Sequence, residues 1–223
     1  MQRLREVSGP VHRGAGVRGP GPPPVRQPLR AGRAGGRTED RKHLGVDLVA
    51  IGEGTTDVAI FTDGSIRHAA VIPIAGDLIT SDIAMALRTP TKDAEEIKVE
   101  YGVAKQLLAD PNEQLEVPGL GDRPPRMLSR QALAGVIEPR IEEIYSLVHQ
   151  VIRESGYEEL LSSGIVITGG AAVMPGMIEL GEDIFLKPVR KGTPTYRGAL
   201  HDMVANPRSA TVMGLLEEAR MAR

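Results

Sequence analysis

The feature that most constrains this chain is a glycine-rich turn, Gly52-Glu53-Gly54-Thr55-Thr56-Asp57, which lies between two short apolar runs. These runs, Leu44–Ile51 and Val58–Phe61, have the length and the branched side chains of buried strands. A turn this short joins antiparallel strands, because a parallel pair needs a long crossover. A further turn at Asp63-Gly64 leads into a third run, Ile66–Ile74. We therefore predict a three-stranded antiparallel meander.

Helical signals follow the meander. We expect Asp77 to cap one helix and Thr91 to cap a second. Ser129 should cap a long third pattern, in which apolar residues recur three and four apart until Gly156. Pro139 interrupts this pattern, which predicts either a kink or two consecutive helices.

The last part of the chain adds a strand and a helix. Residues 117–125 are rich in Pro and Gly and predict a loop before the long helical pattern. Ile165–Thr168 is a short buried strand closed by Gly169-Gly170, and Pro175 fits the first turn of the next helix. The order of strands, helices, strand and helix predicts an α/β architecture.

Composition sets the first residues apart. Residues 1–37 hold six Pro and eight Gly without apolar periodicity, so we expect this segment to be disordered. Lys and Arg outnumber Asp and Glu ten to three in residues 1–42, whereas the remaining residues hold seventeen against twenty-six. The alternative is a basic arm for nucleic acid or acidic lipid, which the lack of interleaved aromatic residues disfavours.

Other classes are excluded by what the sequence lacks. It has no Cys and no stretch of eighteen apolar residues, which excludes a disulfide framework, a thiolate zinc site and a transmembrane helix. The five His have no metal-ligand spacing, and two Phe, four Tyr and no Trp give no platform for single-stranded nucleic acid. We expect a cytoplasmic protein without a metal site of its own and without a nucleic-acid partner.

Three segments carry candidate chemistry. Glycines in the Gly52–Asp57 turn bring backbone N–H groups close to a phosphate, and the adjacent threonines add hydroxyl donors. An ordinary hairpin turn explains the same residues equally well. Gly169, Gly170 and Ala171 leave room for a flat ring at a strand end. Glu95 and Lys98 lie three apart on one helical face, where they suit either the two hydroxyls of a ribose or a solvated ion pair. No Walker motif is present.

These segments, in this order, resemble the second phosphate loop, the ribose-contacting helix and the adenosine loop of the superfamily of actin, sugar kinases and heat-shock chaperones. Within it, longer stretches resemble the FtsA family of bacterial cell-division proteins over about residues 38–218. The stretches that carry this resemblance are Asp77–Pro90, Pro118–Pro125, Leu133–Arg140 and Val166–Gly170.

The resemblance implies a fold and its division. The fold is α/β, the second lobe of an actin-like (ribonuclease H-like) protein, with an antiparallel meander plus helices and an inserted helical subdomain. Residues 38–75 and 156–218 would form the core subdomain, and residues 76–155 the inserted subdomain. Residues 1–37 would precede both as the disordered segment.

The resemblance also implies a role, an adaptor that binds ATP with Mg, polymerises, and tethers the FtsZ ring to the membrane at the division site, on the inner face of the cell membrane. Gly52, Gly54, Thr55 and Thr56, next to Asp57, would face the phosphates, Glu95 and Lys98 the ribose, and Gly169, Gly170 and Ala171 the adenine. The inserted subdomain would bind the C-terminal tail of FtsZ. The cationic residues expected there are Arg126, Arg130 and Arg140.

The sequence departs from this family in ways that predict impaired ATP binding. Ala50 stands where the family has the aspartate that holds magnesium, and Glu53, where the family has glycine, adds repulsion of ~1 to 4 kcal/mol per charge pair at 4 Å. The family's first lobe has no counterpart, and residues 215–223 lack the apolar face of a membrane helix. We therefore expect contact with the membrane through partners only, and possible self-association through surface that the first lobe would cover.

Two alternatives to a non-catalytic adaptor fragment stay open. One is a working ATPase or phosphotransferase of the same superfamily, which Ala50 disfavours. The other is a truncated remnant with no independent role, which the change of composition near Thr38 favours.

Overall fold

The computed structural model describes residues 5–6, 45–63, 65–194 and 201–221. The predicted disordered segment, residues 1–37, lies outside the described residues except for Arg5 and Glu6. The strands are β1 (Arg5–Glu6), β2 (Val46–Ile51), β3 (Thr56–Thr62), β4 (Ser65–Ile72), β5 (Gln114–Val117), β6 (Arg126–Ser129), β7 (Ile165–Thr168) and β8 (Val189–Lys191). The α-helices are α2 (Gly76–Leu87), α3 (Thr91–Tyr101), α4 (Arg130–Ser155), α5 (Met177–Phe185), α6 (His201–Val204) and α7 (Ala210–Met221). Four 3-10 turns join them: η1 (Gln106–Leu108), η2 (Glu158–Leu160), η3 (Ala171–Val173) and η4 (Pro207–Ser209).

The main sheet has the strand order β1-β4-β3-β2-β7-β8. Strands β2, β3 and β4 form the predicted antiparallel meander, while β7 pairs parallel with β2 on one side and with β8 on the other. In the parallel pair, Ala50 of β2 lies opposite Thr168 of β7. The carboxyl ends of these two strands therefore lie at the same edge of the sheet, and so do the two glycine turns that follow them.

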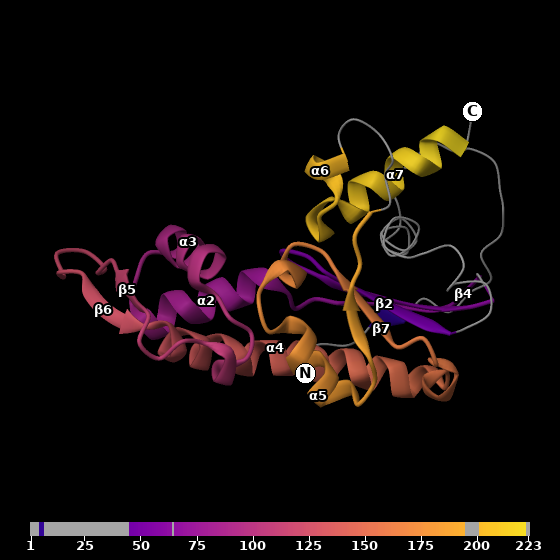
Figure 1. Cartoon of the computed structure of the whole chain (residues 1–223), viewed down its shortest axis with the longest axis horizontal. Helices are drawn as coiled ribbons and strands as arrows, with labels where there is room; N and C mark the ends of the chain where they lie inside the picture. Colours follow the sequence, from indigo (N-terminus) through magenta and orange to yellow (C-terminus); the bar gives the residue numbers. More distant parts are fainter. Residues whose placement is uncertain (1–4, 7–44, 64, 195–200, 222–223) are drawn as a thin grey trace.

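Helices cover both faces of this sheet (Figure 1). Helix α4 packs with α5 on the face that carries Val49 and Ile51, and residues of both helices join one large buried cluster. On the other face, Leu48, Ala50 and Val166 pack with Ala210 at the start of α7. Because successive side chains of a strand point to opposite faces, a strand that is buried on both faces reads as the unbroken apolar run seen in the sequence.

Helices α2 and α3 and the hairpin β5–β6 extend away from the main sheet, beside the first half of α4 (Figure 1). The predicted loop over residues 117–125 is the connection of this hairpin, although Val117 itself is the last residue of β5 and is buried. In this hairpin Gln114 pairs with Ser129, and Leu115 pairs with Leu128. Each strand has only four residues, too few for a clear strand pattern, so the two strands were not predicted.

Three predicted helix starts are wrong by one or two residues. Helix α2 has Ala75 at its N-cap, and Asp77 lies inside the first turn, where its Oδ1 accepts a hydrogen bond from the Leu78 N–H at 2.8 Å. Helix α3 follows Pro90 without a side-chain cap, so Thr91 is its first residue. Pro175 stays outside α5, because its carbonyl oxygen accepts a bond from the Ala104 N–H at 2.8 Å and Gly176 supplies the left-handed turn before Met177.

The long helix α4 begins and ends where the sequence predicted, and it decides between the two predictions made for Pro139. Ser129 caps α4 by accepting a bond from the Ala132 N–H at 3.2 Å, and Gly156 ends it in a left-handed conformation. Pro139 lies inside one continuous helix rather than between two. Ile137 and Ile141, both fully buried beside it, hold the helix against the core and offset the hydrogen bond that proline removes.

The part after α5 was largely unassigned by sequence patterns. Strand β8, turn η4 and helices α6 and α7 are short or weakly periodic, and they gain their structure by packing on the sheet. Within the described part of the chain, no helix is both long enough and apolar enough to cross a membrane.

Candidate functional site

The glycine turn after β2 is fixed to the start of α2. The Gly52 N–H closes the turn on the Thr55 carbonyl at 2.9 Å. The carbonyls of Gly52 and Glu53 accept bonds from the N–H groups of Gly76 at 3.2 Å and Asp77 at 2.8 Å. The first donors of α2 are thus used by the turn, which explains why this helix needs no side-chain cap.

The same turn leaves three consecutive donors unused. Among the described residues, the backbone N–H groups of Glu53, Gly54 and Thr55 donate no hydrogen bond. All three residues are exposed. Successive N–H groups of this kind form a concave anion site that requires no cationic side chain.

The second glycine turn lies directly against the first. Gly169 has φ +94°, and a Cβ built on it would be 2.3 Å from the Ile51 carbonyl oxygen. Only glycine fits there, because both the backbone angle and the approach exclude a side chain. Gly170 differs, since nothing lies within 4 Å of the place where its Cβ would be.

A cavity of about 1010 Å³ opens at this edge of the sheet. Five of the predicted nucleotide-binding residues line it: Gly52, Glu95, Lys98, Gly170 and Ala171. The predicted residues Gly54, Thr55, Thr56, Asp57 and Gly169 adjoin these but do not line the cavity itself. The structure therefore brings the three candidate segments together, although they are far apart in the sequence.

Two of the adjoining residues point into the protein. The Thr56 hydroxyl donates to the Ile74 carbonyl at 2.7 Å, so it closes the end of the meander. Asp57 is 6% exposed and lies opposite Ala50 in the β2–β3 pair. Burial raises the pKa of Asp57 from 3.8 to about 6.

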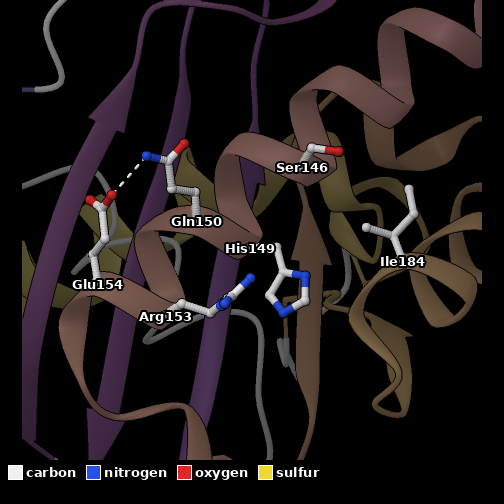
Figure 2. Close-up of a pocket in the computed structure, with 6 residues that line it drawn as sticks. All are labelled: Ser146, His149, Gln150, Arg153, Glu154 and Ile184. Atoms are coloured by element: carbon white, nitrogen blue, oxygen red, sulfur yellow. Dashed lines mark hydrogen bonds between the residues drawn. The ribbon is translucent and has the colours of Figure 1, made fainter.

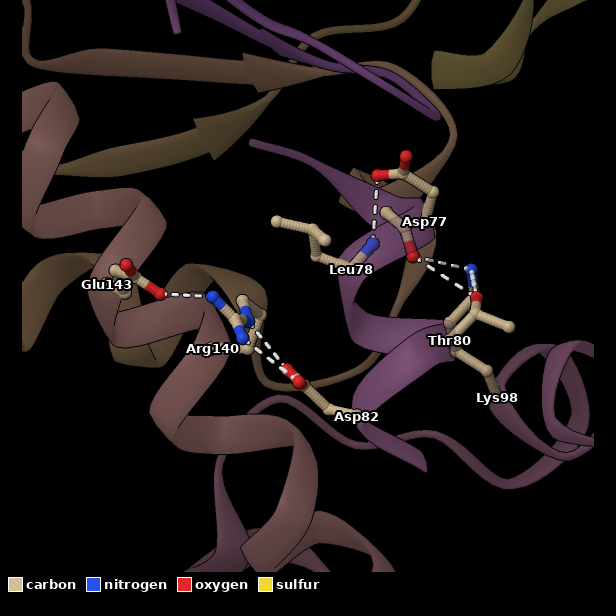
Figure 3. A network of polar contacts seen from close by, with 8 residues as sticks. Asp77, Leu78, Thr80, Asp82, Lys98, Arg140 and Glu143 are labelled. Carbon is tan, nitrogen blue, oxygen red and sulfur yellow. Dashed lines mark hydrogen bonds and ion pairs between the residues drawn. The ribbon is translucent and has the colours of Figure 1, made fainter. Parts of the chain in front are cut away.

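Lys98 and Glu95 are held in a polar network at the cavity wall, and Figure 3 shows the part of it that joins Lys98 to Thr80. The Lys98 Nζ donates to Gly76 O at 3.0 Å and to Thr80 Oγ1 at 2.7 Å, and lies 2.6 Å from Glu95 Oε2. Thr80 also donates to Glu95. Desolvation would raise the pKa of Glu95, but hydrogen bonds from Lys98 and Thr80, with the charges of Lys98 and Arg208, lower it overall. The two side chains form an ion pair in which Lys98 is 14% exposed and Glu95 is 49% exposed, and both sequence interpretations include such a pair.

The three arginines proposed for a partner all make contacts within the chain. Arg126 donates to Leu87 O at 2.7 Å, and Arg130 donates to Tyr101 O at 2.9 Å and pairs with Glu113 at 2.7 Å. Arg140 binds both oxygens of Asp82 and also pairs with Glu143 (Figure 3). Arg126 is the exposed member of the three, and Arg130 also lines the cavity.

A second hollow of about 690 Å³ lies over α4 and α5, away from the glycine turns (Figure 2). Its side chains are mostly polar, and Gln150 donates to Glu154 at 2.7 Å. His149 lies 3.1 Å from Glu158 and packs edge-on against Phe185. His149 therefore has a polar and an aromatic partner within the chain.

Sequence reasoning missed two residues of the main cavity. Thr80 joins the Lys98 network from α2, and Arg208 reaches the cavity from η4. A threonine in a helix and an arginine after Asn206-Pro207 carry no local signal, because both depend on contacts with residues distant in the sequence.

Comparisons with known proteins agree with this geometry. A family model described as Cell division protein FtsA matches residues 48–214 of the chain. The chain is 60% identical over 179 residues to Cell division protein FtsA of Pseudomonas aeruginosa, which covers 80% of the chain and 43% of that relative. It is 46% identical over 186 residues to that of Escherichia coli K12, covering 80% and 44%. The chain thus spans less than half the length of these relatives.

Solved structures confirm the predicted actin-like fold. MreB5 of Spiroplasma citri bound to ADP superposes with a TM-score of 0.69 at 20% identity, covering 88% of the chain and 59% of that structure. The double helical filament of MamK superposes with a TM-score of 0.61 at 15% identity, covering 86% and 58%.

Proposed function

The chain belongs to the FtsA family of cell-division proteins, and on this premise we propose that it binds an adenine nucleotide at the sheet edge and acts as a non-catalytic division adaptor. The observation that carries the nucleotide proposal is the meeting of two glycine turns at one cavity, with three unused N–H groups on the first turn. Solved structures of the same fold with ADP and with AMPPNP support it.

The first glycine turn, which adjoins the cavity, and the cavity walls each have a part in this proposal. The N–H groups of Glu53, Gly54 and Thr55 would hold phosphate oxygens. Glu95, held by Lys98, would accept hydrogen bonds from the ribose hydroxyls, and the bare backbone of Gly170 would lie against the base. Glu53 lines the cavity with an exposed carboxylate, so it weakens phosphate binding.

The residues present do not suit a magnesium ion at the family position. Ala50 offers a methyl group where a carboxylate is needed, and the described residues contain no cluster of three potential metal ligands. Asp57 lies across from Ala50, but its raised pKa reflects an environment that disfavours the charged carboxylate. We therefore propose nucleotide binding with little dependence on magnesium.

Calorimetry with ADP and ATP, each with Mg²⁺ or with EDTA, tests this proposal. We expect binding with both nucleotides and less than a threefold change on adding EDTA. Gly170→Leu should abolish binding without unfolding the protein, because the added side chain enters open space at the cavity. Ser162→Leu, exposed and outside the cavity, is the matched control. An absence of binding to the wild type, or undiminished binding to Gly170→Leu, would contradict the proposal.

We further propose that residues 76–155 form an inserted subdomain that binds the C-terminal tail of FtsZ, with residues 38–75 and 156–218 as the core. Arg126 is the best-placed contact, because it is exposed beside Met127, which is 60% exposed on the same strand. Arg130 and Arg140, bound to carboxylates within the chain, would act by shaping this surface. The role places the protein at the division site, with the membrane reached through partners and self-association as a second mode.

Fluorescence anisotropy with a labelled FtsZ tail peptide tests the adaptor proposal. Arg126→Glu should weaken binding at least tenfold, since it reverses an exposed charge. Arg67→Glu, which reverses an exposed arginine on β4 in the proposed core, should leave binding unchanged. If the peptide binds neither the wild type nor any variant, the adaptor role fails.

A further inference from the structure

The cavity is lined by four cationic side chains, and three of them are already paired. Lys98 pairs with Glu95 at 2.6 Å, Arg130 with Glu113 at 2.7 Å, and Lys92 with Glu96 at 3.8 Å. Arg208 is the exception, because its guanidinium makes no hydrogen bond or ion pair within the residues that the structure describes. Arg208 is exposed, and its positive charge contributes to lowering the pKa of Glu95.

The backbone that carries Arg208 is fixed to the second glycine turn. The Pro207 carbonyl accepts bonds from the Gly169 N–H at 3.2 Å and from the Thr168 hydroxyl at 3.3 Å. The Arg208 N–H donates to Asn206 Oδ1 at 3.0 Å. The backbone of Arg208 is therefore fixed beside the Gly169-Gly170 turn. This is the wall that we propose for the base, and it is separate from the turn that we propose for the phosphates.

The cavity offers one face to a flat ligand and little to cover the other. No aromatic side chain lines it among the described residues. The guanidinium of arginine is planar, is weakly hydrated and stacks on aromatic rings. Arg130 has the same group, but it is held by Glu113 and Tyr101. Arg208 is thus the planar group that remains available.

We propose that Arg208 stacks on the face of the bound base that Gly170 does not cover, so that it contributes affinity for the nucleoside and not for the phosphates. This inference rests on the proposed nucleotide site and adds the residue that recognises the base. It assigns to η4, a segment outside the predicted site, a direct contact with the ligand.

Titrations of adenosine, ADP and inorganic pyrophosphate into four proteins test the inference. The proteins are the wild type, Arg208→Gln, Arg208→Lys and the control Arg153→Gln, which removes another exposed arginine that forms no ion pair with the described residues. Arg208→Gln should weaken adenosine and ADP by the same factor, about three- to tenfold, and leave pyrophosphate unchanged. Arg208→Lys should give most of this loss, because lysine keeps the charge without the plane.

Two results overturn the inference while leaving the nucleotide site in place. One is wild-type affinity of Arg208→Gln for adenosine and ADP. The other is a loss that is confined to ADP and pyrophosphate and is restored by lysine, which would make Arg208 a phosphate contact. If the wild type binds none of the three ligands, the proposed function fails and the inference fails with it. Circular dichroism melting of each variant confirms that the fold is kept.

Discussion

The two ends of strand β2 differ in where their unpaired polar groups lie, exposed at one end and buried at the other. At the carboxyl end, the carbonyls of Gly52 and Glu53 have partners on α2, and the free N–H groups beside them face solvent. At the amino end, Asp47 is fully buried, and neither of its carboxylate oxygens has a hydrogen-bond partner among the described residues. Burial raises the pKa of Asp47 to about 8. The unpaired N–H groups at the carboxyl end are exposed beside a cavity, where a ligand could use them, whereas the unpaired carboxylate at the amino end is buried and reduces stability.

The largest test of this contrast is Asp47→Val. The folded protein holds a proton on Asp47 up to about pH 8, whereas the unfolded chain releases it near pH 3.8. The wild-type free energy of unfolding should therefore fall as pH rises, by ~4 kcal/mol between pH 4 and pH 7, and the valine variant should lack this fall. Urea unfolding at each pH measures it. Asp47→Asn should also remove the pH dependence. It should raise the free energy of unfolding at pH 7 by less than Asp47→Val does, since the amide stays buried without partners. An unchanged slope in both variants would refute the assignment.

The carboxyl end can be probed by the adjacent glycines. Gly169→Ala should lower the free energy of unfolding by about 3 kcal/mol, because it combines a left-handed backbone with a clash against the Ile51 carbonyl. Gly170→Ala should change it by about 0.5 kcal/mol or less, since its Cβ meets nothing. Equal effects of the two substitutions would mean that the turns are not packed as described.

Asp57 is an intermediate case, a buried carboxylate that lies opposite Ala50 near the carboxyl end of β2. Its raised pKa predicts that stability is lost as pH rises from about 4 to about 6. Asp57→Asn should remove this loss and add about 1–2 kcal/mol at pH 7. Thermal melts of the variant and the wild type at pH 4, 5, 6 and 7 check this, and parallel curves would contradict it.

Glu95→Gln gives the smallest expected effect, since the Glu95 side chain is 49% exposed. The lowered pKa of Glu95 means that its contribution exists above the ordinary pKa of 4.5 and disappears as pH falls through the lowered value. Loss of the pair with Lys98 should reduce stability by ~0.5 kcal/mol at pH 7 and by nothing in strong acid. Glu96→Gln, whose partner Lys92 is 86% exposed, is the control and should match the wild type.

Local patterns in the sequence predicted the elements whose causes are local. Turns that separate runs of β-branched residues predicted the meander. Ser129 and Gly156 predicted the start and the end of α4. The parallel pairing of β2 with β7, the β5–β6 hairpin and the position of α7 depend on contacts between distant segments. For the same reason, Glu95 and Gly170 were predicted from their motifs, whereas Arg208 was not.

The bonds from Gly76 and Asp77 to the turn at Gly52 and Glu53 have a mechanical consequence. The start of α2 is therefore attached to the turn. Asp82, about one and a half turns further along α2, forms an ion pair with Arg140 in the middle of α4. These contacts connect the turn to the long helix α4 through α2, so we expect a shift of the turn to be passed on to α4.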